Sequence, residues 1–121
     1  SVRPAMPVNG PAYTATVSWM IERRLRRVGR RLADARSQLE IAEEQLLHLA
    51  DDSSDAEIRA LVSDDRTASV EHHEAARHRD AMARHRDDLR EAIVRLEGEQ
   101  DSLLDQLTVA KGTGSSGGGG R

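Results

Sequence analysis

The chain has 121 residues with 18 basic and 21 acidic side chains, so its net charge is only -3, and it contains no Cys, no Phe, one Trp and one Tyr. These counts exclude disulfides and thiolate metal sites, and they leave too few aromatic side chains to fill an ordinary globular core. No apolar run approaches the roughly 20 residues that a transmembrane helix needs. We therefore expect long helices in a soluble, cytoplasmic protein.

Arginine dominates the basic side chains, with 17 Arg against a single Lys. The physical properties of the two side chains do not explain this ratio, because a solvated helix face accepts either. Codon bias in a GC-rich genome does explain it, and the ratio therefore indicates a bacterial source.

Residues 1–13 contain all three prolines and show no helical periodicity. This composition is typical of a disordered arm, and the segment lacks the apolar core of a signal peptide. Thr14 or Thr16 can cap the helix that follows, because a hydroxyl oxygen accepts a hydrogen bond from the first free N–H groups. The predicted hairpin domain accordingly covers residues 14–110.

The first predicted helix covers about residues 16–51 and carries a ladder of apolar side chains at alternating intervals of four and three residues. The ladder consists of Ile21, Leu25, Val28, Leu32, Ala35, Leu39, Ala42, Leu46 and Leu49. This heptad spacing forms one apolar stripe along a helix and predicts a second helix packed against that stripe.

Asp and Ser side chains cluster at residues 51–55. Because these side chains compete with the backbone for hydrogen bonds, the cluster predicts that the first helix ends there. A short connecting helix is then predicted at about residues 55–62, with Ile58, Leu61 and Val62 on one face. It is too short to be stable alone, so we expect it to fold onto the larger assembly.

The second long helix is predicted at about residues 67–109. Within it, the segment Ala76–Asp80 returns unchanged as Ala83–Asp87, which confirms the seven-residue period from the polar side. Residues 111–121 are rich in Gly and Ser, a composition typical of a flexible tail.

The charges indicate how the two helices pair. In the first helix, residues 22–36 contain seven Arg, whereas residues 38–52 contain five acids and no basic side chain. The second helix has the opposite order, with arginines at residues 77–90 and acids at residues 97–105. Antiparallel pairing therefore opposes unlike charges. The predicted fold class is all-α: an antiparallel coiled-coil helical hairpin of two long helices and one short connecting helix, with disordered tails.

The hairpin seam is predicted to contain Ile21, Leu25, Val28, Leu32, Leu39, Leu46, Met82, Leu89, Leu96 and Leu103. Two registers remain open. If opposed residue numbers add up to 124, Leu39 lies opposite His85; if they add up to 128, it lies opposite Leu89. Size complementarity favours the first register. Ile41, Leu47, Val94 and Leu104 fall outside the seam, which favours self-association into a four-helix bundle.

The histidines do not have the spacing of a metal site. His73 and His78 are five residues apart and do not share a helix face, while His78 and His85 stand roughly 10 Å apart along one face, too far for one ion. We expect these last two at the edge of the seam, and no role is assigned to His72. The sequence predicts no metal and no cofactor. It also contains no nucleophile and base in a concave site, so no enzyme is predicted.

The strongest functional feature is the Arg-rich face of the first helix. Trp19, Arg23, Arg24, Arg26, Arg27, Arg30 and Arg31 lie outside the apolar stripe. The acids of the second helix are too few to neutralise them, and a basic face attracts phosphates or acidic proteins. We expect a non-enzymatic coiled-coil interaction module that binds a protein partner or self-associates as a dimer. The alternative is a nucleic-acid-binding accessory protein. Neither a membrane nor a small-molecule substrate is expected.

Overall fold

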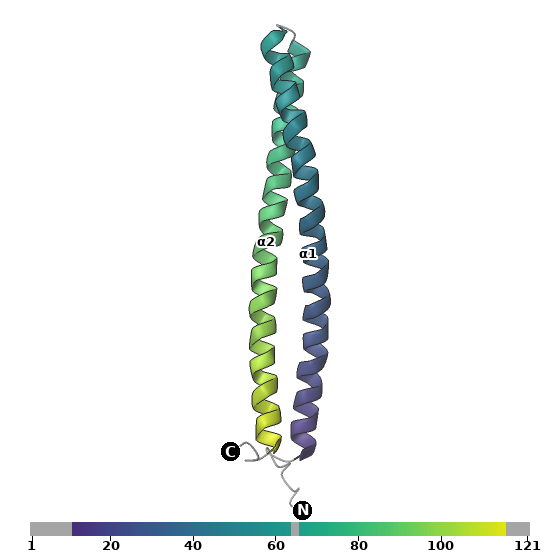
Figure 1. Cartoon of the computed structure of the whole chain (residues 1–121), viewed down its shortest axis with the longest axis vertical. Coiled ribbons are helices and arrows are strands. Elements are labelled where there is room, and N and C mark those ends of the chain that lie inside the picture. The colour runs from purple at the N-terminus through teal and green to yellow at the C-terminus, as the bar shows by residue number, and fades with distance from the viewer. Residues whose placement is uncertain (1–10, 64–65, 116–121) are drawn as a thin grey trace, which may run out of the picture. The chain divides into compact units, whose positions relative to one another are not determined.

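The structure is a computed structural model that describes residues 11–63 and 66–115. Within these ranges every residue except Ser63 belongs to one of two helices, α1 at Pro11–Val62 and α2 at Arg66–Ser115 (Figure 1). The prediction of an all-α protein with two long helices is confirmed.

The predicted break at residues 51–55 and the predicted short helix at 55–62 are wrong, because α1 continues without interruption to Val62. The apolar ladder continues as well, through small side chains. Ser53 and Ala56 follow Leu49 at intervals of four and three residues and are almost fully buried, with 4% and 2% of their surface exposed. Their burial stabilises a helix that the local Asp and Ser preferences oppose.

The exposed residues of the same segment contradict a second prediction. Ile58, Leu61 and Val62 were expected to fold onto the assembly, yet they are 58%, 80% and 83% exposed. Because the buried stripe at this end of α1 consists of Ser and Ala, the large aliphatic side chains lie on the solvent side of the helix.

Both long helices also extend beyond their predicted ends. α1 begins at Pro11, so residues 11–13 are helical and only residues 1–10 of the predicted arm lie outside the described ranges. Proline is favoured at the first position of a helix, where no intrahelical partner exists for an N–H group. α2 ends at Ser115, so the predicted tail becomes helical over residues 111–115, and residues 116–121 are outside the described ranges.

The chain divides into two compact units, each containing a stretch of both helices. Unit 1 consists of Ser1–Leu32 with Arg95–Arg121, and unit 2 consists of Ala33–Val94. On α1 the boundary lies between Leu32 and Ala33, and neither residue is next to a proline or a glycine in the sequence.

Unit 1 is held together by large aliphatic side chains. Ile21, Val28 and Leu103 form its buried cluster, against which Val17, Leu25, Leu96, Leu107 and Ala110 pack. The two helices are antiparallel in this unit, because the Glu22 carboxylate lies 3.2 Å from Nζ of Lys111 and Nε of Arg24 lies 3.6 Å from the Glu99 carboxylate. Burying one such aliphatic side chain contributes about 1.5–3 kcal/mol, whereas an exposed ion pair contributes about 0–1 kcal/mol. The aliphatic cluster therefore dominates the stability of this unit.

Unit 2 is built from smaller side chains. Its buried residues are Ala35, Ala42, Ser53, Ala56, Ala68 and Leu89. Here too α1 and α2 are antiparallel, with ion pairs between Glu43 and Arg90 at 2.9 Å and between Arg59 and Glu71 at 3.8 Å. The Glu43–Arg90 pair agrees with the opposition of acidic and basic segments that the sequence predicts.

All ten predicted seam residues are at least half-buried, five of them fully: Ile21, Val28, Leu32, Leu89 and Leu103. Both registers remain open. His78 and His85, which lie opposite α1 seam residues if the numbers add up to 124, are exposed, and so is Arg79, which lies opposite one if they add up to 128. The half-buried Glu99 agrees with the first register, and the half-buried Gln100 and Arg86 agree with the second.

Candidate functional site

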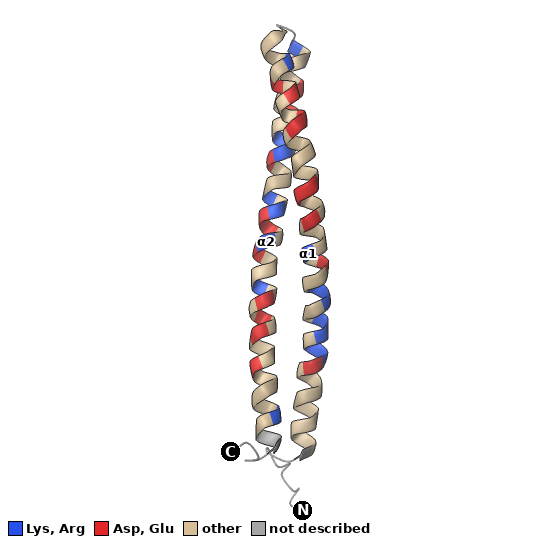
Figure 2. Cartoon of the chain, viewed as in Figure 1, with Lys and Arg blue, Asp and Glu red and all other residues tan. Residues whose placement is uncertain are grey.

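The seven residues predicted as a binding face all lie exposed on α1 within unit 1. This basic face consists of Trp19, Arg23, Arg24, Arg26, Arg27, Arg30 and Arg31. The seam positions Ile21, Leu25 and Val28 alternate with them, so the burial of the seam directs the arginines to the solvent side of the helix. Figure 2 shows the resulting band of basic residues on α1.

Trp19 and Arg23 contact each other on the basic face. The guanidinium carbon of Arg23 lies 5.4 Å from the centroid of the indole ring, within the range of a cation–π interaction. The two residues are four positions apart on one helix, which places them side by side. Trp19 is nevertheless 53% exposed, so the largest apolar side chain of the chain is available for contact with another molecule.

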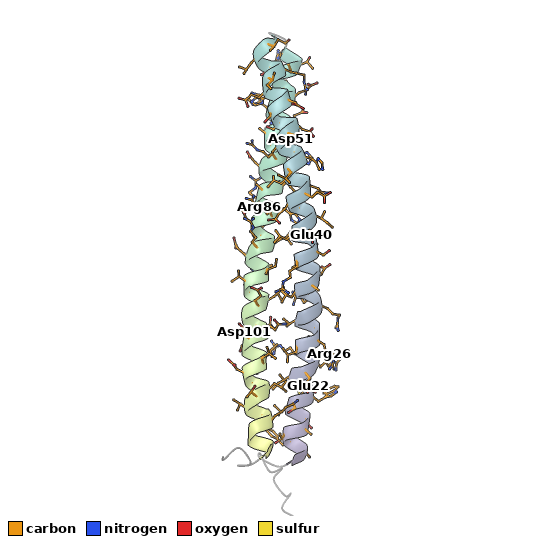
Figure 3. All side chains as sticks on the ribbon, in the orientation of Figure 1. Glu22, Arg26, Glu40, Asp51, Arg86 and Asp101 are labelled. Atoms are coloured by element: carbon orange, nitrogen blue, oxygen red, sulfur yellow. The ribbon has the colours of Figure 1, made fainter. Side chains whose placement is uncertain are left out.

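Most arginines of the basic face have no acidic partner. Arg24 pairs with Glu99 at 3.6 Å. Within the described ranges, no carboxylate pairs with Arg26, Arg27, Arg30 or Arg31, and in Figure 3 the Arg26 side chain points away from α2. Their charges are therefore neutralised only by solvent and counterions.

An open hollow lies on the same face. It is lined by Trp19, Met20, Arg23, Arg24 and Arg27. The hollow combines an apolar floor with guanidinium groups, each of which presents several N–H donors in a plane that matches a carboxylate. This arrangement can bind a carboxylate next to an apolar side chain.

A second surface was missed by the sequence analysis. On α1 in unit 2, the exposed side chains of Asp51 and Asp55 precede those of Ile58, Leu61 and Val62. We name these five residues the acidic–apolar patch. The signal was present in the sequence: once Ser53, Ala56 and Ala60 are read as the buried ladder, these five residues must lie on the outer side of the helix.

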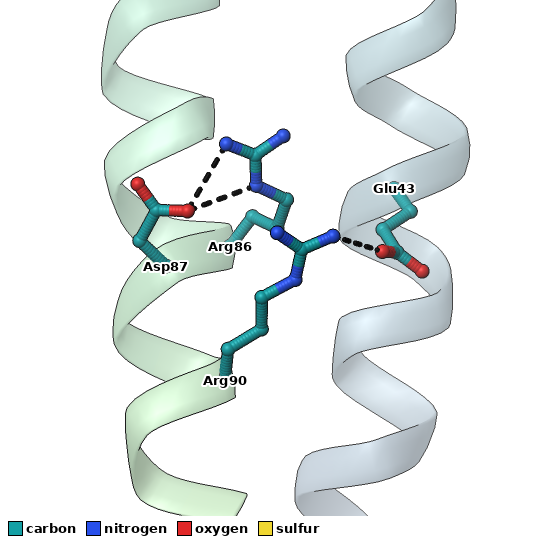
Figure 4. A network of polar contacts seen from close by, with 4 residues as sticks. All are labelled: Glu43, Arg86, Asp87 and Arg90. Atoms are coloured by element: carbon teal, nitrogen blue, oxygen red, sulfur yellow. Dashed lines mark hydrogen bonds and ion pairs between the residues drawn. The ribbon is translucent and has the colours of Figure 1, made fainter.

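The seven-residue repeat on α2 forms the same local contact twice. Arg86 donates to Asp87 from Nε, with both Nε and a terminal nitrogen 3.0 Å from one carboxylate oxygen, and Arg79 approaches Asp80 at 3.4 Å. Figure 4 shows Arg86 and Asp87 beside the pair of Arg90 with Glu43. In each repeat the arginine thus lies beside the acid that follows it, which balances part of its charge within α2.

The histidines give no coordination geometry. The rings of His72 and His73 lie 5.6 Å apart, and Nδ1 of His72 is buried without a hydrogen-bond partner in the described part of the chain. His78 and His85 are exposed, with His78 at the rim of a hollow that also includes Met82. Across residues 11–63 and 66–115, no three His, Asp or Glu side chains gather as a metal ion would require.

Neither α1 nor α2, over its described residues, contains a stretch both apolar and long enough to cross a bilayer. Comparison of the chain with protein-family models, with curated proteins and with solved structures finds no match.

Proposed function

We propose that this protein is a non-enzymatic coiled-coil interaction module whose basic face binds an acidic surface of a protein partner. The coiled-coil assignment is supported by the uninterrupted four-and-three spacing of buried or half-buried residues along α1, from Ile21 to Ala60. The binding assignment is carried by one observation, an exposed Trp19 in contact with Arg23 and close to Arg26, Arg27, Arg30 and Arg31, which have no ion pair in the described chain.

The composition of the face favours a protein partner. Trp and Arg are the residue types that most often contribute large binding energies at protein interfaces. The single Trp of the chain lies on this face, where it buries no seam surface. Its contact with Arg23 also restricts both side chains before binding, which lowers the entropy lost when a partner covers them.

The unpaired arginines favour nucleic acid as the second candidate, because phosphates bind guanidinium groups in the same manner as carboxylates. Two features weaken this alternative. The net charge of the chain is -3, and only one aromatic ring is present on the face, whereas single strands are bound by several rings in succession.

A photo-crosslinking amino acid at Thr16 tests the proposal. Thr16 is exposed on α1 seven residues before Arg23 and therefore on the same side of the helix. In the organism that encodes the chain, we expect a protein adduct from this position that Arg26→Glu combined with Arg30→Glu removes. The matched control is the same amino acid at Val109, which is also exposed but lies on α2.

Two results would overturn the proposal. One is the same adduct from both positions, or an adduct that the double charge reversal leaves unchanged. The other is an adduct that nuclease destroys and protease does not, which would establish the nucleic-acid alternative. In that case, the affinity of a labelled duplex should also fall steeply as salt is raised.

A further inference from the structure

We propose that the basic face of one copy of this chain binds the acidic–apolar patch of a second copy, with the two α1 segments antiparallel. This inference rests on the proposed function and names the partner surface. It follows from three observations: exposed apolar side chains in both places, opposite and unpaired charges, and matching spacing along the helix.

Both surfaces have apolar side chains that the described residues leave largely exposed. On the basic face these are Trp19 and Met20, which are 53% and 59% exposed. On the acidic–apolar patch, Leu61 and Val62 are more exposed still. Contact between the two pairs would remove four large side chains from water, and apolar burial is the main favourable term in protein association.

The charges of the two surfaces are opposite and available. Arg26 and Arg30 have no ion pair in the described chain, and neither do Asp51 and Asp55. The one arginine at residues 51–63 is Arg59, which already lies 3.8 Å from Glu71. No uncompensated basic side chain of α1 therefore repels the arginines of an incoming copy at this patch.

The order of the residues selects the antiparallel orientation. Along the basic face, the apolar Trp19 and Met20 precede the charged Arg26 by about two helical turns. Along the acidic–apolar patch the order is reversed, since Asp55 precedes Leu61 and Val62 by about the same distance.

An antiparallel contact places apolar residues against apolar residues and basic residues against acidic ones. It sets Trp19 and Met20 against Val62 and Leu61, Arg26 against Asp55, and Arg30 against Asp51. A parallel contact would instead place the indole beside the carboxylates and the guanidinium groups beside the aliphatic side chains. The antiparallel arrangement is therefore the one in which charged and apolar groups both find complements.

Sedimentation velocity over a range of concentrations tests self-association, and the emission of Trp19 reports directly on the contact because it is the only Trp. We expect association together with a blue shift of the emission as the indole leaves water. Arg26→Glu with Arg30→Glu should weaken association by about tenfold or more, because like charges then oppose one another. Asp51→Arg with Asp55→Arg should do the same.

The decisive variant combines all four changes, R26E, R30E, D51R and D55R, in one chain. It exchanges the charges within the two opposed pairs, Arg26 with Asp55 and Arg30 with Asp51, so association and the blue shift should return. The matched control is Arg77→Glu with Arg84→Glu, which alters the charge by the same amount at exposed residues outside both surfaces and should leave association unchanged. Circular dichroism of every variant establishes that the helices are intact.

The inference is overturned if the chain is monomeric at every concentration, or if the fourfold exchange fails to restore association while the helices are intact. These results are distinct from a failure of the proposed function. A monomeric chain whose Thr16 adduct still depends on Arg26 and Arg30 retains a protein partner, but that partner is not a second copy.

Discussion

The two units use the same pairing of α1 with α2 but fill the space between the helices differently. Unit 1 buries Ile21, Val28, Leu32 and Leu103, whereas the buried residues of unit 2 are Ala and Ser with the single exception of Leu89. Large side chains bury more apolar area per residue, and small ones allow the helix backbones to approach more closely. Unit 1 thus contributes more of the stability, and unit 2 tolerates less added volume.

The two units also differ in the contacts of their arginines. In unit 2, Arg79 and Arg86 each pair with the Asp that follows them, and Arg86 is half-buried. In the described part of unit 1, Arg26, Arg27, Arg30 and Arg31 are exposed and have no ion pair. These four arginines are therefore available for binding, whereas Arg79 and Arg86 already have an acidic neighbour.

Leu32→Ala should have the largest effect on the free energy of unfolding. Leu32 is 2% exposed in unit 1, and the cavity left by its truncation should lower the free energy of unfolding by about 2–5 kcal/mol, as measured by urea denaturation. Leu47→Ala, at a residue 71% exposed in unit 2, is the control and should change stability by less than about 0.5 kcal/mol. Equal effects of the two changes would contradict the assignment of the core.

Ala42→Leu tests the close packing of unit 2. Ala42 is 2% exposed, so a larger side chain must displace its neighbours, at a cost of about 1–3 kcal/mol in the free energy of unfolding. The control is Ala33→Leu in the same unit, where the alanine is exposed and the change should be nearly neutral. A rise in melting temperature with Ala42→Leu would show that unit 2 has room for larger side chains.

Asp87→Asn gives the smallest expected effect. It removes the carboxylate beside the largely buried Arg86 and should cost about 1 kcal/mol in thermal unfolding. Asp80→Asn makes the same change in the other repeat, where Arg79 is 44% exposed and the contact is longer, so the loss should be smaller. In a chain that carries Arg86→Met, Asp87→Asn should have no effect; a loss that persists there would assign the carboxylate another role.

The heptad spacing predicted two long helices, because burial of one apolar stripe outweighs local preferences over many turns. The prediction for residues 51–55 was wrong for a specific reason. The predicted ladder ended at Leu49, whereas the buried or half-buried positions continue through Ser53, Ala56 and Ala60, whose small side chains resemble surface residues. Local Asp and Ser preferences then predicted a helix end that tertiary packing overrides.

The candidate site was also only partly predictable from the sequence. The exposure of the seven residues of the basic face follows from the ladder, because a buried stripe leaves the remaining positions of the helix in solvent. The contact of Arg23 with Trp19 was available from their spacing of four residues. The acidic–apolar patch was not recognised, because its position depends on the continuity of α1 past Asp55.

The short connection between Val62 and Arg66 has a consequence for the order of folding. Residues that meet in unit 2, such as Arg59 and Glu71, are close in sequence, whereas Glu22 and Lys111 of unit 1 come from opposite ends of the chain. Each doubling of the closed loop costs about 0.6 kcal/mol of chain entropy. The weaker seam is therefore the easier one to nucleate, and its formation shortens the loop that the stronger seam must close. We expect the two helices to pair first beside the connection and then progressively toward the ends of the chain. Mutations in unit 2 should therefore slow folding, and mutations in unit 1 should mainly accelerate unfolding.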